Sequence, residues 1–151
     1  MTVTVQPVTA TDAGWLAALH ARCFPEDSWR EASWRNLLRQ PGVGGAVASV
    51  DGVPVGVVLW RRAAEEAEIL TIGVVPTERR RGVGGRLLDH ALSALPRVVA
   101  AVFLEVAADN EAARRFYTGR GFTRIGRRAG YYRRGRVSVD ALLMRVDRDT
   151  G

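Results

Sequence analysis

The stretch Ile69–Leu92, ILTIGVVPTERRRGVGGRLLDHAL, carries most of the information about the fold. It begins as an apolar strand, turns at Pro76, and passes through arginines and glycines into a helix. The apolar residues of that helix repeat on one face: Leu87, Leu88, Ala91, Leu92 and Leu95. The first N–H groups of a helix have no partner inside it, and glycine lets a ligand approach them closely. We therefore predict a site for an anion such as pyrophosphate, formed by Arg79, Arg80, Arg81, Gly82, Val83, Gly84 and Gly85.

Other phosphate-binding motifs fit this turn poorly. The chain has no lysine, so the P-loop pattern G-x-x-x-x-G-K-[ST] is absent. The dinucleotide pattern G-x-G-x-x-G needs a third glycine where Leu87 stands, which argues against a Rossmann fold. The plainest alternative is a glycine-rich turn beside arginines that contact only water.

The composition predicts one globular domain over residues 1–151, because 47% of the residues are hydrophobic and 25% are charged. No apolar run approaches the roughly 18 residues of a membrane span. The N-terminal MTVTVQPVTA is not built like a secretion signal, and the one cysteine, Cys23, cannot form an internal disulfide. These features predict a cytoplasmic protein with no membrane partner. We expect no metal, since no cysteine–histidine cluster is present.

The net charge is +6, and every basic side chain is arginine. Residues 114–148 are especially basic, with eleven arginines against Asp140 and Asp147. These arginines are spread through predicted strands, a helix and a turn. This distribution favours solvated arginine faces and a phosphate-bearing cofactor over a nucleic-acid surface. A basic nucleic-acid-binding module is kept as the alternative from another functional class.

The hydrophobic patterns divide the chain into about seven strands and about four helices. Strands are expected at residues 3–8, 43–50, 53–62, 65–75, 98–107, 122–132 and 137–146. Helices are expected from the Thr11-Asp12 cap to about residue 23, at 29–39, from the glycine turn to 95, and at 111–118. Strands and helices do not alternate strictly, so the pattern predicts an α+β fold with a mixed sheet and helices on both faces.

Three local signals place turns and caps within this order. Asp51-Gly52 predicts a tight hairpin. Ser28 and Glu31 have the spacing of a capping box that would open the second helix. The inward residues of the first helix are expected to be Trp15, Leu16, Leu19 and Cys23.

Two motifs resemble those of a known family. The spacing R-x-x-G-x-G at Arg79, Gly82 and Gly84 resembles the acetyl-coenzyme A motif of the GNAT acetyltransferases, whose order of elements is also the one predicted here. The segment LEVAADNEAARRFYTGRGF, residues 104–122, is most similar to the ribosomal-protein alanine N-acetyltransferases (RimI type). The resemblance implies an acetyl-coenzyme A-dependent N-acetyltransferase with a single GNAT-like domain.

Glu105 is the only charge in the apolar segment at residues 103–107. A buried carboxylate must be paired, reach solvent, or have a raised pKa. It is either a structural glutamate bonded to an amide or an arginine, or a general base. The resemblance implies the second role, in which Glu105 takes a proton from the attacking amine.

The same resemblance assigns roles to residues before and after Glu105 in the sequence. Tyr117 would give a proton to the departing thiolate, although a tyrosine there can equally be a packed aromatic residue. Asn110 would contact the cofactor, and the backbone of Ile72, Gly73 and Val74 would pair with its pantetheine arm. Tyr131 and Tyr132 match residues near the peptide cleft of the subfamily, or lie on opposite faces of a strand. We expect His20, His90 and Cys23 to be packing or surface residues.

The sequence departs from the subfamily at two positions that bear on the acceptor. Ala107 replaces a usual arginine, and Val139-Asp140 replaces a usual Glu-Asp pair. The substrate of the subfamily has an N-terminal alanine followed by arginine, and a missing acidic side chain weakens that match. The acceptor is therefore left open between a protein N-terminus, a ribosomal protein among them, and a small amine such as a polyamine, an amino sugar or an amino acid.

Overall fold

The computed structural model describes residues 2–149. Within them the chain forms seven strands and four α-helices, which confirms the predicted α+β class. Single 3-10 turns at Ala10–Asp12 and Pro76–Glu78 precede the first and third helices. The elements are β1 (Val3–Pro7), α1 (Ala13–Cys23), α2 (Glu31–Leu38), β2 (Val43–Val50), β3 (Val53–Ala63), β4 (Glu66–Val74), α3 (Val83–Ala94), β5 (Ala101–Ala107), α4 (Glu111–Gly119), β6 (Thr123–Arg134) and β7 (Val137–Asp147).

The strands form a mixed sheet in the order β1-β2-β3-β4-β5-β7-β6. β4 and β5 are parallel, as a connection through α3 requires, and the hairpin-linked pairs are antiparallel. The chain divides into two compact units, one with residues 2–63 and 70–96, the other with residues 64–69 and 97–149. One domain over residues 1–151 stays a prediction.

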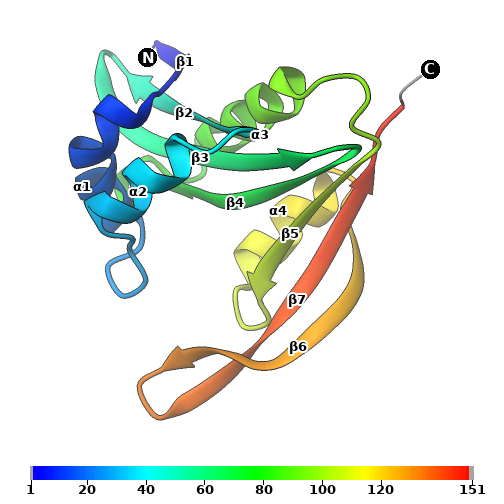
Figure 1. Cartoon of the computed structure of the whole chain (residues 1–151). Coiled ribbons are helices and arrows are strands. Elements are labelled where there is room, and N and C mark those ends of the chain that lie inside the picture. The colour runs from blue at the N-terminus through cyan, green and yellow to red at the C-terminus, as the bar shows by residue number, and fades with distance from the viewer. Residues whose placement is uncertain (1, 150–151) are drawn as a thin grey trace. The chain divides into compact units, whose positions relative to one another are not determined.

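The first unit is built on the antiparallel strands β1, β2 and β3, which α1, α2 and α3 flank (Figure 1). Residues 55–60 of β3 are buried without interruption, because α1 and α3 both pack against this strand. Asp51 and Gly52 have φ values of 49° and 84°, so the chain turns back through two left-handed residues. This geometry confirms the predicted hairpin.

The apolar face of α3 was predicted correctly except at Leu92, which is half-buried. Leu87, Leu88 and Ala91 are fully buried, and Leu95 is 4% exposed. Leu16 of α1 and Trp34 of α2 in the same unit are also fully buried. Burial of a large apolar side chain contributes about 1.5–3 kcal/mol, so this face holds α3, and with it the glycine turn, in place.

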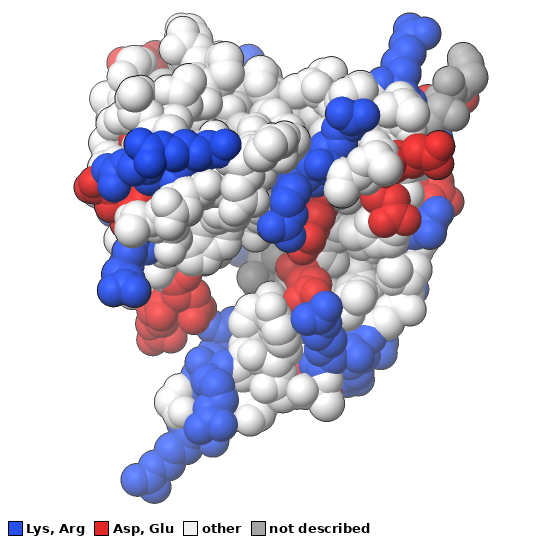
Figure 2. Space-filling view, viewed as in Figure 1, with Lys and Arg blue, Asp and Glu red and all other residues white. Residues whose placement is uncertain are grey.

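The second unit contains the start of β4, then β5, β7 and β6, with α4 between β5 and β6. β5 begins at Ala101 and not at the predicted residue 98, and just before it Ala100 donates its N–H to the carbonyl of Glu65 at 2.7 Å. β6 and β7 form a long hairpin that is largely exposed along β6 (Figure 1). Basic side chains gather over the end of this hairpin (Figure 2).

The capping box expected at Ser28 is wrong. α2 begins at Glu31 with Arg30 as its N-cap residue, and no side chain caps it. The segment before α2 is held instead by His20, whose Nδ1 accepts the N–H of Trp29 at 3.0 Å. A partner from α1 therefore replaces the local cap that the Ser28 pattern predicted.

The orientation of Trp15 was also predicted wrongly. Its side chain is 41% exposed, and its indole N–H donates to the Asp12 carboxylate at 3.2 Å. The inward residues of α1 follow a stripe at three- and four-residue spacing, which Trp15 misses by one position: Ala13, Leu16, Leu19, His20 and Cys23.

Candidate functional site

The glycine turn opens α3 as the sequence predicts. Gly82 is the N-cap residue with φ +80°, and the first helical bond runs from the N–H of Arg86 to the carbonyl of Gly82 at 3.1 Å. The N–H groups ahead of Arg86 belong to a first turn in which the helix itself supplies no acceptor. Together with the helix dipole, this geometry suits a bound anion.

The three arginines of the turn differ in what they contact. Arg79 donates from Nε to the carbonyl of Val74 at 2.9 Å and from Nη2 to the carbonyl of Cys23 at 3.0 Å. Arg81 lies 3.4 Å from the carboxylate of Glu78. Arg80 has φ +66°, a left-handed value in a non-glycine residue. Arg79 therefore ties the end of β4 to the end of α1, a structural role that sequence reasoning missed.

Ile72, Gly73 and Val74 form the half-buried end of β4. A side chain on Gly73 would stand 2.5 Å from the ring of Phe24 and 2.9 Å from Cβ of Cys23, so the end of α1 closely covers this backbone. The carbonyl of Val74 already accepts the Arg79 bond. The pairing of these backbone groups with a pantetheine arm stays a prediction.

Glu105 lies on β5 with 20% of its side chain exposed, between the buried residues Leu104 and Val106. Its Oε1 lies 3.2 Å from Nη2 of Arg128, on β6. The ion pair fits the expectation that a carboxylate in this strand needs a partner. It leaves a fifth of the side chain exposed, and the role of general base stays a prediction.

Tyr117 is 7% exposed and packs edge-on against Phe116 and Phe122, with ring centroids 5.2 and 5.7 Å away. Burial, and next the neighbouring Tyr132, raises the pKa of its hydroxyl well above the usual range. The hydroxyl therefore stays protonated at neutral pH, as a proton donor must. The packing predicted as the alternative role is confirmed, and the donor role stays a prediction.

Asn110 has a clear structural task. It is the N-cap of α4, and its side-chain oxygen accepts the N–H of Ala113 at 3.1 Å. The cap uses the oxygen only, so the side-chain NH₂ is the group with which a ligand would interact. Contact with a cofactor stays a prediction.

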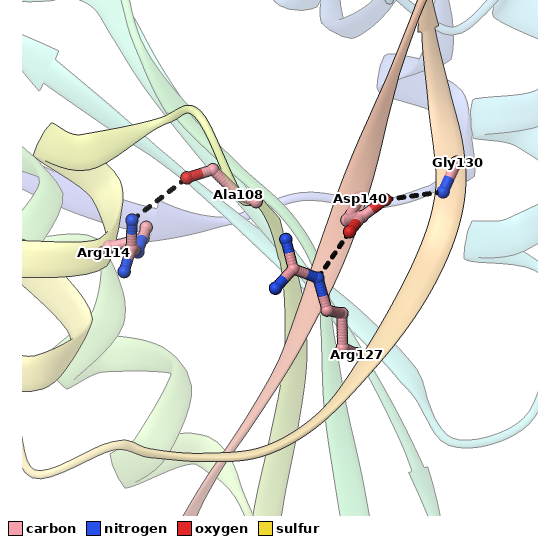
Figure 3. A network of polar contacts seen from close by, with 5 residues as sticks. All are labelled: Ala108, Arg114, Arg127, Gly130 and Asp140. Atoms are coloured by element: carbon pink, nitrogen blue, oxygen red, sulfur yellow. Dashed lines mark hydrogen bonds and ion pairs between the residues drawn. The ribbon is translucent and has the colours of Figure 1, made fainter.

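Asp140 is bound by its own hairpin (Figure 3). Its carboxylate accepts the N–H of Gly130 at 2.8 Å and the Nε–H of Arg127. These bonds, first that of Gly130 and then that of Arg127, lower the pKa of Asp140. They fasten β6 to β7 beside an irregularity in the register between Arg128 and Tyr132. Nearby, Arg114 of α4 donates to the carbonyl of Ala108 at 3.1 Å.

His20 and Cys23 are packing residues, as expected. The ring of His20 is 1% exposed and lies among Phe24, Trp29 and Trp34, with centroids 5.0 to 5.3 Å away. Nδ1 accepts a backbone N–H, so the proton is on Nε2, which donates to Thr71 Oγ1 at 3.0 Å. Burial lowers the pKa of His20 to about 4 and raises that of Cys23 to about 11.

The low pKa of His20 predicts a loss of stability in acid. Below pH 6.5 the unfolded chain binds a proton that the folded chain takes up only near pH 4. The contribution of the neutral His20 ring to the free energy of unfolding is therefore complete above pH 6.5. It is lost as the pH falls toward 4, by about 3 kcal/mol in all. Urea unfolding across this range is expected to show a flatter pH dependence for His20→Gln than for His90→Gln, the matched control. If the free energy of unfolding falls with pH equally steeply in the two variants, His20 is not the source of the loss in acid.

Two kinds of site are absent among residues 2–149. No group of three or more His, Cys, Asp and Glu side chains could hold a metal ion there. No helix in this part of the chain is long and apolar enough to cross a membrane. The candidate residues lie in separate units, with residues 72–85 in the first and Glu105, Asn110 and Tyr117 in the second.

Comparison with known proteins identifies the family. The model of the acetyltransferase (GNAT) family matches residues 14–122. The N-alpha-acetyltransferase RimI of Mycobacterium tuberculosis is 39% identical, over 96% of this chain and 92% of the relative. The [ribosomal protein bS18]-alanine N-acetyltransferase of Salmonella typhimurium is 28% identical, over 95% of each chain. The ribosomal-protein-S18-alanine N-acetyltransferase from Escherichia coli has the same fold, with a TM-score of 0.87 at 24% identity over 97% of this chain and 94% of that one. The chain therefore belongs to the GNAT family and is an acetyl-coenzyme A-dependent N-acetyltransferase.

Proposed function

We propose that this enzyme transfers an acetyl group to the N-terminal α-amino group of a protein. The relatives support an acceptor of this kind, because one is an N-alpha-acetyltransferase and another is a ribosomal-protein alanine N-acetyltransferase. A protein that begins with alanine, such as a ribosomal protein, is accordingly the first acceptor to test.

The proposed mechanism is direct transfer. Glu105 takes a proton from the acceptor amine, directly or through a water molecule, as the amine nitrogen forms a bond to the acetyl carbonyl carbon. The carbon–sulfur bond then breaks, and Tyr117 gives its proton to the sulfur, so that coenzyme A leaves as a free thiol. Glu105 returns its proton to solvent, and Tyr117 is reprotonated. The N–H groups at Arg79–Gly85 bind the phosphates, the backbone of residues 72–74 pairs with the pantetheine arm, and Asn110 contacts the cofactor.

The pKa of the acceptor amine favours an N-terminus over a lysine side chain. An α-amino group has a pKa near 7.7–8.0, so its neutral form costs about 1 kcal/mol at pH 7. A lysine amine with a pKa near 10.4 costs about 4.6 kcal/mol. A single carboxylate is a sufficient base for the first task.

The observation that carries the proposal is the exposure of Glu105. Leu104 and Val106, its neighbours in β5, are 2% and 5% exposed, whereas a fifth of the Glu105 side chain reaches solvent. Phe103 and Glu105 are the two half-buried residues of β5, and the partial exposure of the one carboxylate supports its role as the base. The protonated hydroxyl of Tyr117 in the same unit supports the paired roles of base and acid.

The proposal predicts release of free thiol from acetyl-coenzyme A when the enzyme meets a peptide that begins with alanine. The same peptide with a blocked N-terminus is the control and is expected to give no thiol. A panel of polyamines, amino sugars and amino acids is assayed in parallel. Turnover on the panel alone would overturn the proposal and assign the chain to the enzymes of small amines.

A further inference from the structure

Two arginines of β6 pair with carboxylates of the neighbouring strands β5 and β7. Arg128 pairs with Glu105 at 3.2 Å, and Arg127 binds Asp140. The guanidinium of Arg128 also lies over the ring of Tyr131, 5.2 Å from its centroid, and Arg128 is 54% exposed. A positive charge therefore stands beside the carboxylate that the proposed function assigns as the base.

β6 and the turn that follows it carry further positive charge and contain no acidic residue. Residues 123–136 contain six arginines and no aspartate or glutamate. Arg134 lies 3.5 Å from Asp109, but among residues 2–149 no ion pair engages Arg124, Arg133 or Arg136. β6 is exposed over most of its length, and basic side chains cover the end of the hairpin in Figure 2. An anionic partner is the complement of this surface.

We propose that Arg128 and the basic hairpin select acceptors in which the residues that follow the N-terminal amine are acidic. The inference rests on the proposed function, since it takes Glu105 as the place where the amine loses its proton. A general base lies about 3 Å from the nitrogen that it deprotonates. Arg128 is 3.2 Å from that base, and successive Cα atoms are only about 3.8 Å apart. The second and third residues of the acceptor therefore come within reach of β6.

The charge of this surface distinguishes acidic from basic side chains at the second and third positions of the acceptor. An acidic side chain at the second or third position is attracted to guanidinium groups, and a charge-assisted hydrogen bond to Arg128 becomes available. A basic side chain there is repelled. Asp140 does not offset that repulsion, because the Gly130 N–H and Arg127 already bind its carboxylate. The preference is thus opposite to that of the subfamily that the sequence resembles, in which arginine follows the N-terminal alanine.

The test compares three peptides that begin with alanine and differ only at positions two and three, which are both Glu, both Gln or both Arg. We expect kcat/KM for the Glu peptide to exceed that for the Arg peptide by about tenfold or more, mainly through KM. The ratio is expected to shrink at high salt. Arg128→Gln is expected to remove most of the preference, and Arg128→Glu to reverse it. Arg115→Gln on α4, where Arg115 pairs with Glu111, is the matched control and keeps the ratio.

A second variant covers the case in which substitution of Arg128 disturbs folding. Arg133→Gln removes an arginine of the same strand that has no contact with Glu105, and it is expected to lower the ratio by a smaller factor. Equal rates on the three peptides, or a preference for the Arg peptide, would overturn this inference while leaving the proposed function supported. Activity on small amines alone would overturn both. Salt-sensitive binding of an oligonucleotide that Arg128→Gln abolishes, without a charge preference among peptides, would assign the hairpin to nucleic acid instead.

Discussion

Glu105→Gln is expected to lower the turnover number of acetyl transfer by about 10²–10³-fold, within the usual contribution of a general base. The amide has nearly the shape of the carboxylate but cannot accept the proton of the amine. Binding of acetyl-coenzyme A is expected to change by less than about twofold, because the predicted phosphate site at residues 79–85 lies on another element. Steady-state kinetics and cofactor titration measure the two effects separately.

The control for this variant is Glu111→Gln, which neutralises an exposed carboxylate that pairs with Arg115 on α4. It is expected to retain the activity of the native enzyme. Removal of the Glu105 charge leaves Arg128 without that partner, but Arg128 is half exposed and solvent replaces the lost contact. We therefore expect little change in thermal stability. A variant that loses cofactor affinity tenfold and keeps its turnover number would remove Glu105 from the role of base.

The elements that were predicted well are those in which local chemistry and tertiary packing agree. Asp51-Gly52 tolerates left-handed backbone angles wherever it occurs, so the hairpin could be identified from two residues. The helix after the glycine turn has a wide apolar face, and Leu87, Leu88 and Ala91 are buried as that face requires. Apolar periodicity indicates which side of a helix is buried. In α3 that burial is also what stabilises the helix, so the pattern predicted it well.

The errors occur where a distant residue supplies the partner. Ser28 has the local pattern of a cap, yet His20 accepts the bond from Trp29 because a buried aromatic cluster brings α1 to this segment. The anion site predicted at Arg79 stays a prediction, but sequence reasoning missed that its guanidinium bonds to carbonyls 5 and 56 residues away in the sequence. Spacing along the chain carries no signal for such contacts.

The candidate site shows the same division. Glu105 could be singled out because a lone charge in an apolar strand is costly, but its partner Arg128 comes from a different strand and could not be named. A burial argument finds the residue that needs a partner, whereas strand pairing decides which partner it meets. That pairing is also what creates the specificity proposed for the basic hairpin.

Tyr117→Phe is expected to lower the turnover number by about 10–10²-fold, since the departing thiolate then has to take its proton from solvent. Only the hydroxyl is lost, and the ring keeps its edge-on contacts with Phe116 and Phe122, so the fold is expected to survive. Thr118→Ala removes a hydroxyl from the next, exposed position of α4 and serves as the control. Burial raises the pKa of Tyr117, so in the native enzyme this group is expected to produce no alkaline fall in rate up to pH 10. An alkaline limb below pH 10 that Tyr117→Phe removes would contradict the raised pKa but keep Tyr117 as the acid, whereas an unchanged turnover number in Tyr117→Phe would remove it from that role.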